Sequence, residues 1–278
     1  MLIDFHTHTF PDSIAQKTIA VLNEKIKVQT GHYLDPLTDG TANSLMETME
    51  REGVDLSVVL PIATKPSQTD TINTVSVNIR DEKLISFATI HPENEDKEKI
   101  LRKVRDDGYV GIKIHPDYQS CYIDSKESIE ILQICESLGL YTVIHAGVDG
   151  GYPPPYHALP ERIKNTLEYI SGKYIIAAHL GGFLSWDDVE KYLVGTDIYF
   201  DTAMTYGYLA PEQFGRIIKN HGADKILFGS DCPWNSPASI LSLIESLGLS
   251  EDELERIRWR NAADILGISI DKKRQKVL

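Results

Sequence analysis

Short apolar runs alternate with amphipathic stretches along almost all of the 278 residues. The apolar runs are rich in Ile and Val, as strands buried on both faces should be. Each is followed by sequence long enough for a helical crossover, and Gly often ends the helical pattern. The pattern predicts a first strand at 2–5 and later strands at 54–62, 84–90, 110–114, 141–144, 174–178, 198–200 and 225–228.

Amphipathic stretches separate these strands. They predict helices at 12–27, 43–52, 95–106, 125–138, 157–171, 186–193, 211–220, 236–247 and 251–266. Eight alternating β and α units favour a closed (β/α)8 TIM barrel, an α/β fold. The alternative is an open doubly wound sheet, whose dinucleotide-binding form carries a Gly-rich first turn that this chain lacks. No linker or repeat divides the sequence, so we expect one domain over 1–278, with a mobile charged tail at 271–278.

Residues that can bind a metal or a proton follow seven of the eight predicted strands. Of nine histidines, only His32, His157 and His221 lie away from strand ends. In a barrel, the carboxyl ends of all strands meet at one rim, where active sites lie. This segregation predicts a shared site built from His6, His8, His91, His115, His145, His179, Asp201 and Asp231.

The first strand ends in the pair His6 and His8. Residues two apart share a face of a strand, so both imidazoles should point the same way. Two adjacent imidazoles form half of a metal site. The alternative to a metal site is that one histidine caps the strand and the other is exposed. The metal site is favoured because other strands also end in residues that can bind a metal.

Three later strand-end residues fit a site. Small residues follow His145 and leave space for a ligand, and His179 precedes two glycines in the same way. A buried Asp231 would be an uncompensated charge unless a cation or an imidazolium pairs with it.

Other strand-end residues have more than one interpretation. His115 is followed by Pro, so it either caps its strand or joins the site, whereas His91 is expected to be structural. Asp201 could orient a ligating imidazole from behind. Lys113 faces the same side as His115, and a buried barrel lysine is paired, neutral or chemically modified.

Composition narrows the classes of partner. The net charge is −13, which argues against nucleic acid and anionic membranes, because both attract basic patches. No transmembrane run or signal peptide is recognisable. The three cysteines form no CxxC pattern, so we expect a reduced, cytoplasmic protein. The partner that we expect is a small-molecule substrate. The oligomeric state cannot be read from the sequence.

Six motifs occur together in an order that matches a known family. The chain resembles the amidohydrolase superfamily, specifically its amidohydrolase-2 branch, which includes aminocarboxymuconate-semialdehyde decarboxylase and related decarboxylases and hydrolases. The likeness covers essentially the whole chain. The motifs are Phe5-His6-Thr7-His8, Ile112-Lys113-Ile114-His115-Pro116, Ile144-His145-Ala146-Gly147, Ala178-His179-Leu180-Gly181-Gly182, Gly229-Ser230-Asp231-Cys232-Pro233 and Asn261-Ala262-Ala263.

The resemblance implies a metal site and a catalytic residue. One divalent metal would be held by His6, His8, His145 and Asp231, and His179 would be the acid/base that handles activated water. Zinc suits nitrogen-rich ligands, with manganese or iron as alternatives. In some superfamily members the lysine at the position of Lys113 is carboxylated and bridges two metals, but the match with the mononuclear branch is better.

Three functions remain open at this point. The first is hydrolysis of an amide, lactone or ester by metal-activated water, with Asp231 and His179 as catalytic residues. The second is non-oxidative decarboxylation of an unsaturated or aromatic acid, and the third is a binding protein that has lost catalysis. Substrate contacts are expected from residues in or near the rim loops: Phe10, Lys113, His115, Tyr156 and Tyr206.

Overall fold

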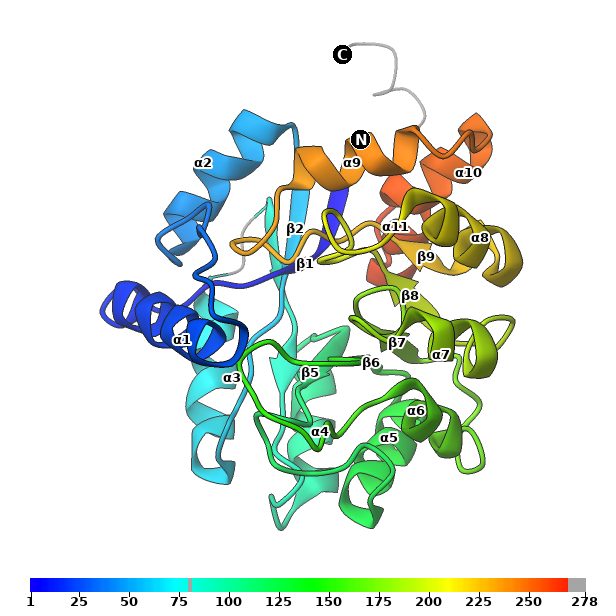
Figure 1. The fold of residues 1–278 in the computed structure, drawn as a ribbon. Coiled ribbons are helices and arrows are strands. Elements are labelled where there is room, and N and C mark those ends of the chain that lie inside the picture. Colours follow the sequence, from blue (N-terminus) through cyan, green and yellow to red (C-terminus); the bar gives the residue numbers. More distant parts are fainter. Residues whose placement is uncertain (80–81, 270–278) are drawn as a thin grey trace.

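The computed structural model describes residues 1–79 and 82–269, so the predicted tail at 271–278 lies outside the described residues. Parallel strands run through the centre of the molecule and helices surround them (Figure 1). The strands are β1 (Ile3–Thr7), β2 (Leu56–Val59), β3 (Leu84–Ser86), β4 (Ala88–Thr89), β5 (Gly111–Ile114), β6 (Tyr141–Ile144), β7 (Ile175–Ala177), β8 (Tyr199–Asp201) and β9 (Ile226–Leu227).

Helices follow most of the strands. They are α1 (Ala15–Thr30), α2 (Ala42–Glu52), α3 (Thr69–Asn78), α4 (Lys97–Asp106), α5 (Lys126–Leu138), α6 (Pro160–Thr166), α7 (Trp186–Tyr192), α8 (Pro211–His221), α9 (Pro237–Glu245), α10 (Glu251–Glu255) and α11 (Asn261–Leu266). Two 3-10 turns, η1 (Pro66–Gln68) and η2 (Ala223–Lys225), and a π-helical turn, η3 (Arg256–Arg260), complete the described elements.

The strands form two parallel sheets in chain order, β1-β2-β3 and β4 to β9. β3 and β4 are one predicted strand interrupted at Phe87, where the pairing changes from β2 to β5. On the other side, β1 contacts the segment after β9: Phe5 N–H donates to Phe228 O, and Asp231 N–H donates to His6 O, both at 2.8 Å. The sheets are not one continuous cylinder, but strand order, direction and helical crossovers confirm the predicted (β/α)8 fold.

Local sequence explains where several helices begin and end. The side chain of Thr41 accepts a hydrogen bond at the start of α2, and Ser125 does so at the start of α5. Gly53 and Gly139 end these helices with positive φ, which glycine adopts without strain. The predicted helix at 157–171 is shorter in the structure, since only α6 is regular and turns follow it. The predicted helix at 251–266 is divided by η3.

Two apolar clusters hold the strands in place. The larger one joins strands to the outer helices, including Leu101 of α4 and Phe214 of α8. The smaller joins β1, β2, β6, β7 and β9 to α11 and contains Phe5 and Phe87, whose rings meet edge to face. Among the described helices, none has the length and apolar character needed to cross a bilayer.

Candidate metal centre

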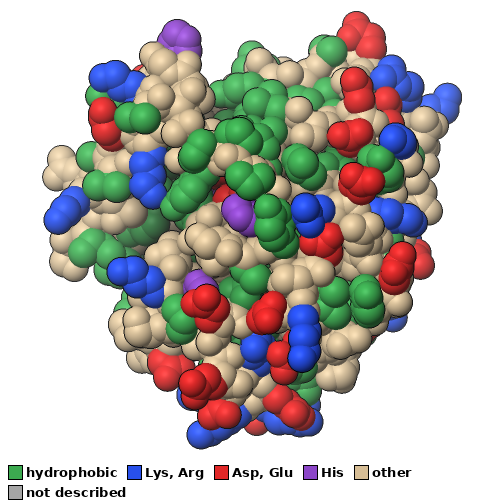
Figure 2. All heavy atoms as spheres, turned by 60° about the horizontal axis from the view of Figure 1, so that its bottom comes forward, with side chains coloured by type: hydrophobic (Ala, Val, Ile, Leu, Met, Phe, Trp, Pro, Cys, Tyr) green, Lys and Arg blue, Asp and Glu red, His purple; other side chains and the backbone are tan. Residues whose placement is uncertain are grey.

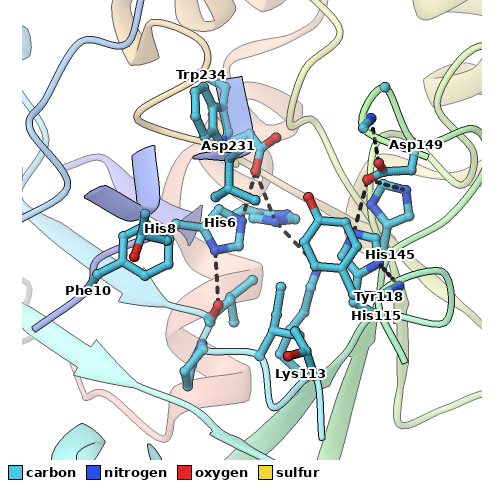
Figure 3. A pocket seen from close by; sticks show the side chains of 18 of the residues that line it. His6, His8, Phe10, Lys113, His115, Tyr118, His145, Asp149, Asp231 and Trp234 are labelled. Carbon is cyan, nitrogen blue, oxygen red and sulfur yellow. Dashed lines mark hydrogen bonds and ion pairs between the residues drawn. The ribbon is translucent and has the colours of Figure 1, made fainter. Parts of the chain in front are cut away.

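The ends of β1 and of the segment after β9 bring together three side chains. His8 Nε2 lies 3.1 Å from Asp231 Oδ1, and His6 Nε2 lies 3.2 Å from the same oxygen (Figure 3). The ladder between β1 and β2 shifts register between Asp4 and Thr7, next to these ligand atoms. Irregular pairing of this kind re-aims side chains beside functional sites. We call this set the His6–His8–Asp231 group.

Hydrogen bonds on the far side of each ring fix where the hydrogens lie. His6 Nδ1 donates to Asp201 Oδ2 at 2.8 Å, and His8 Nδ1 donates to the carbonyl oxygen of Leu60 at 3.0 Å. Burial lowers the pKa of His6 well below its usual value, so its ring is neutral. A neutral ring that donates through Nδ1 presents a lone pair at Nε2, which here faces the Asp231 carboxylate.

This arrangement fits a cation. Burial raises the pKa of Asp231, but the close contacts with the rings of His6 and His8 outweigh this effect, so the pKa lies well below the usual range. The carboxylate is therefore ionised, and its oxygen and the lone pair at His6 Nε2 repel each other unless a cation lies between them. Imidazole nitrogens and a carboxylate are also the ligand types of divalent transition metals.

A second set of side chains lies across the cavity. His115 Nε2 is 3.2 Å from Asp149 Oδ2, and His145 Nε2 is 3.8 Å from the same atom. The rings of His115 and His145 stack with centroids 4.0 Å apart, and Tyr118 stacks on the other face of His115 at 3.8 Å. We call this set the His115–His145–Asp149 group. The structure thus places His145 here and not with the other three predicted ligands.

His179 lies between the two groups. Its ring centroid is 5.2 Å from that of His6 and 4.8 Å from that of His145. His179 Nδ1 donates to Ala203 O at 3.3 Å, and its neutral Nε2 accepts from His145 Nδ1 at 3.0 Å. The neutral His145 ring is left with a lone pair at Nε2, which is buried and has no hydrogen-bond partner. A buried nitrogen lone pair without a hydrogen-bond partner is typical of a residue that binds a metal ion.

Lys113 supplies a buried nitrogen near the His6–His8–Asp231 group. Its Nζ lies 3.4 Å from His6 Nε2. Burial lowers the pKa of Lys113 to about 8, although nearby carboxylates oppose the change. It is the sole Lys or Arg among the described residues that line the cavity.

The backbone at two site residues lies in the left-handed region. φ is +60° at His179 and +73° at Asp231. Conformations of this kind cost about 1–3 kcal/mol and occur where the surrounding structure holds them in place. Here the hydrogen bond from His179 N–H to Asp201 Oδ1 at 2.9 Å does so, as does the one from Asp231 N–H to His6 O.

A cavity of about 830 Å³ opens above these groups. Figure 2 shows a histidine side chain in a recess with a largely hydrophobic rim. Four of the five residues expected to contact substrate line this cavity: Phe10, Lys113, His115 and Tyr156. Tyr206 is 47% exposed and does not line it, whereas Tyr208 does.

Sequence reasoning missed two carboxylates at the site. Asp149 follows His145 by four residues, and its place in the loop directly after a predicted strand is the signal that could have found it. Asp4 is buried beneath the site, where its carboxylate accepts hydrogen bonds from the N–H groups of His6 and Ser230 and from Ser230 Oγ. His91, expected to be structural, is buried outside the cavity and accepts from Glu93 N–H.

Fold and site together define a (β/α)8 protein with a candidate divalent-metal centre at the carboxyl ends of its strands. Residues 3–268 match the family model described as Amidohydrolase, in its amidohydrolase-2 branch, and the chain belongs to this family. The resemblance inferred from the sequence is thereby confirmed. No curated protein matches the chain by sequence.

Solved structures share the fold over nearly their whole length. A dihydroxybenzoic acid decarboxylase from Polaromonas sp. JS666, with bound manganese and the inhibitor 2-nitroresorcinol, is 16% identical with a TM-score of 0.67, covering 98% of each chain. A 5-carboxyvanillate decarboxylase from Sphingomonas paucimobilis is 15% identical with a TM-score of 0.65, covering 96% of this chain and 99% of that one. An uncharacterised TIM-barrel protein from Bordetella bronchiseptica is 16% identical with a TM-score of 0.71, covering 96% and 98%.

Proposed function

We propose that this chain is a metal-dependent hydrolase that acts on an amide, ester or lactone bond of a small acidic substrate. The observation that carries the proposal is the ionised Asp231 carboxylate, whose Oδ1 lies within 3.2 Å of the Nε2 atoms of both His6 and His8. In our proposal these three residues hold one divalent ion, and His145, whose Nε2 lies 3.8 Å from Asp149 Oδ2 in the structure, would become the fourth ligand once its ring turns toward that ion. Zinc suits this nitrogen-rich set, and manganese or iron are alternatives. Such an ion supplies the Lewis acidity that polarises a carbonyl and acidifies water.

The chain's own residues would move the protons. His179 Nε2, which accepts from His145 in the structure, is the atom that would take a proton from the attacking water and return it to the leaving group. The ionised Asp231 would accept a hydrogen bond from that water and orient it. Lys113 Nζ, the buried nitrogen beside His6, would anchor an acidic group of the substrate.

Decarboxylation is the second candidate, and a different observation favours it. The stacked rings of Tyr118, His115 and His145 line the cavity beside the proposed metal. Planar aromatic acids pack edge to face against rings of this kind. The decarboxylases among the similar structures act on or are named for dihydroxybenzoate and carboxyvanillate, which are planar aromatic acids.

The test is a substrate panel with zinc-loaded and manganese-loaded protein. One arm holds amides, esters and lactones, and the other holds aromatic acids that include 2,6-dihydroxybenzoate, with released carbon dioxide as the readout. Turnover in the first arm alone supports hydrolysis, and turnover in the second alone replaces it with decarboxylation. Activity should disappear on chelation and return with the metal. Less than about half an equivalent of bound metal, with no turnover in either arm, would favour a binding protein.

A further inference from the structure

The cavity does not end at the polar groups but continues between α1 and α3. On α1, the lining residues Thr18, Leu22 and Ile26 lie four positions apart and therefore on one face of the helix. On α3, Ile72 and Val75 line the opposite wall. We call this part of the cavity the α1–α3 arm.

The apolar side chains of the α1–α3 arm are not part of the protein core. α1 buries only Ala15 and Ile19. Leu22, Ile26 and Val75 are half-buried, and none belongs to either apolar cluster of the described residues. Apolar surface that neither packs in a core nor lies singly on the outside marks a binding region.

Polar contacts hold α1 over the cavity. Lys25 Nζ donates to Tyr152 OH at 3.0 Å and lies 4.5 Å from the centroid of that ring, which joins α1 to the loop after β6. The side chain of Asn23 exchanges two hydrogen bonds with the backbone of Leu34. The helix therefore keeps its position without burying its apolar stripe, and the arm stays open to a ligand.

From these observations we infer that the substrate carries an apolar chain, which lies in the α1–α3 arm while its polar head lies at the metal end. The arm is continuous with the cavity that holds the metal-end residues, and the α1 and α3 residues lining it bear no charge. The cavity volume of about 830 Å³ is near the upper end of the range for ligand pockets, which leaves room for more than a single-ring head. The inference rests on the proposed function only in placing the polar head beside the metal.

The test uses straight-chain carboxylic acids from acetate to decanoate, titrated calorimetrically into the metal-loaded full chain. Affinity should rise about fourfold per added methylene, as expected for burial of a CH2 group. Val75→Asp and Leu22→Asp should abolish this rise while acetate still binds. The matched controls are Val77→Asp and Val21→Asp, because Val77 (41% exposed) and Val21 (48% exposed) lie on the same helices and do not line the cavity.

The outcomes separate this inference from the proposed function. If affinity rose with the chain length of the acid but no compound of the substrate panel were turned over, the inference about the α1–α3 arm would be supported and the proposed activity rejected. Equal affinity for all acids, or equal loss in the control variants, would overturn the inference. A second copy of the chain is the competing occupant: sedimentation that shows a dimer dissociating in Val75→Asp, with no chain-length dependence in the wild type, would also overturn it.

Discussion

His6 Nδ1 donates a hydrogen bond of 2.8 Å to Asp201 Oδ2, and both side chains are fully buried. The two residues come from β1 and β8, so the contact joins distant parts of the chain. Asp201 Oδ1 also accepts from the N–H groups of His179 and Ala203. One carboxylate therefore orients a proposed ligand and the proposed acid/base together.

Asp201→Asn should weaken metal binding roughly 10- to 100-fold, because the partner behind His6 loses its charge. The asparagine oxygen can still accept from the two backbone N–H groups, so the fold should persist. Competition with a chromogenic chelator measures the affinity. Asp197→Asn, a change at an exposed carboxylate paired with Lys225, is the control and should bind metal like the wild type. Unchanged affinity in Asp201→Asn would contradict the orienting role.

His179→Ala should keep its metal and lose turnover by roughly 10²- to 10⁴-fold, the range for removal of a general acid/base. The reason is that His179 bonds to His145 and Ala203 and not to the His6–His8–Asp231 group. Metal content and kcat are measured on the same preparation. His6→Ala is the contrast and should lose both. Turnover near the wild-type value in His179→Ala would remove this residue from the mechanism.

Asp149→Asn should lower kcat/KM roughly 10- to 100-fold, because the carboxylate charge that lies 3.2 Å from His115 Nε2 is removed. One equivalent of metal should remain bound, since Asp149 does not contact the His6–His8–Asp231 group. Steady-state kinetics with metal analysis checks both statements. Asp188→Asn, at an exposed position of α7, is the matched control. A variant that loses its metal would instead make Asp149 a ligand.

Asp4→Asn should change how stability depends on pH. Burial raises the pKa of Asp4 from 3.8 to about 7 in the folded protein. Between these values the folded state binds the proton more tightly than the unfolded state, so wild-type stability falls as the pH rises through this window. The variant lacks this contribution and should gain stability relative to the wild type from pH 5 to pH 8. Urea unfolding with chelator present measures the free energy of unfolding of both proteins at each pH. If the two proteins showed the same dependence of this free energy on pH, the prediction would be wrong.

Much of the fold could be predicted because strand and helix patterns are local. The apolar run at 110–114 and the amphipathic stretch at 125–138 both gave elements where they were expected. The break at Phe87 could not be predicted, since it arises where a strand changes partners between two sheets. The division of 251–266 by a π-helical turn was likewise invisible to the periodicity.

In the candidate site, too, the features set by neighbouring residues in the sequence could be predicted, and those set by contacts between distant segments could not. His6 and His8 were expected to share a face, and their Nε2 atoms do lie near one oxygen of Asp231. His145 was expected with them, yet in the structure its Nδ1 is bonded to His179 and its ring is stacked on His115. A rotamer depends on neighbours from other strands, and spacing along one strand does not reveal it.

The sequence by itself determined the eightfold β/α alternation, the placement of histidines and aspartates at strand ends, and the family. These follow from residue type and from periods of two and 3.6 residues, which act over a few positions. Only the tertiary structure decided that His6 and His179 lie together with Asp201, that His145 lies with His115 and Asp149, that Asp4 lies beneath the site, and that the cavity extends between α1 and α3. Those features depend on contacts between segments far apart in the chain, which only packing can bring together.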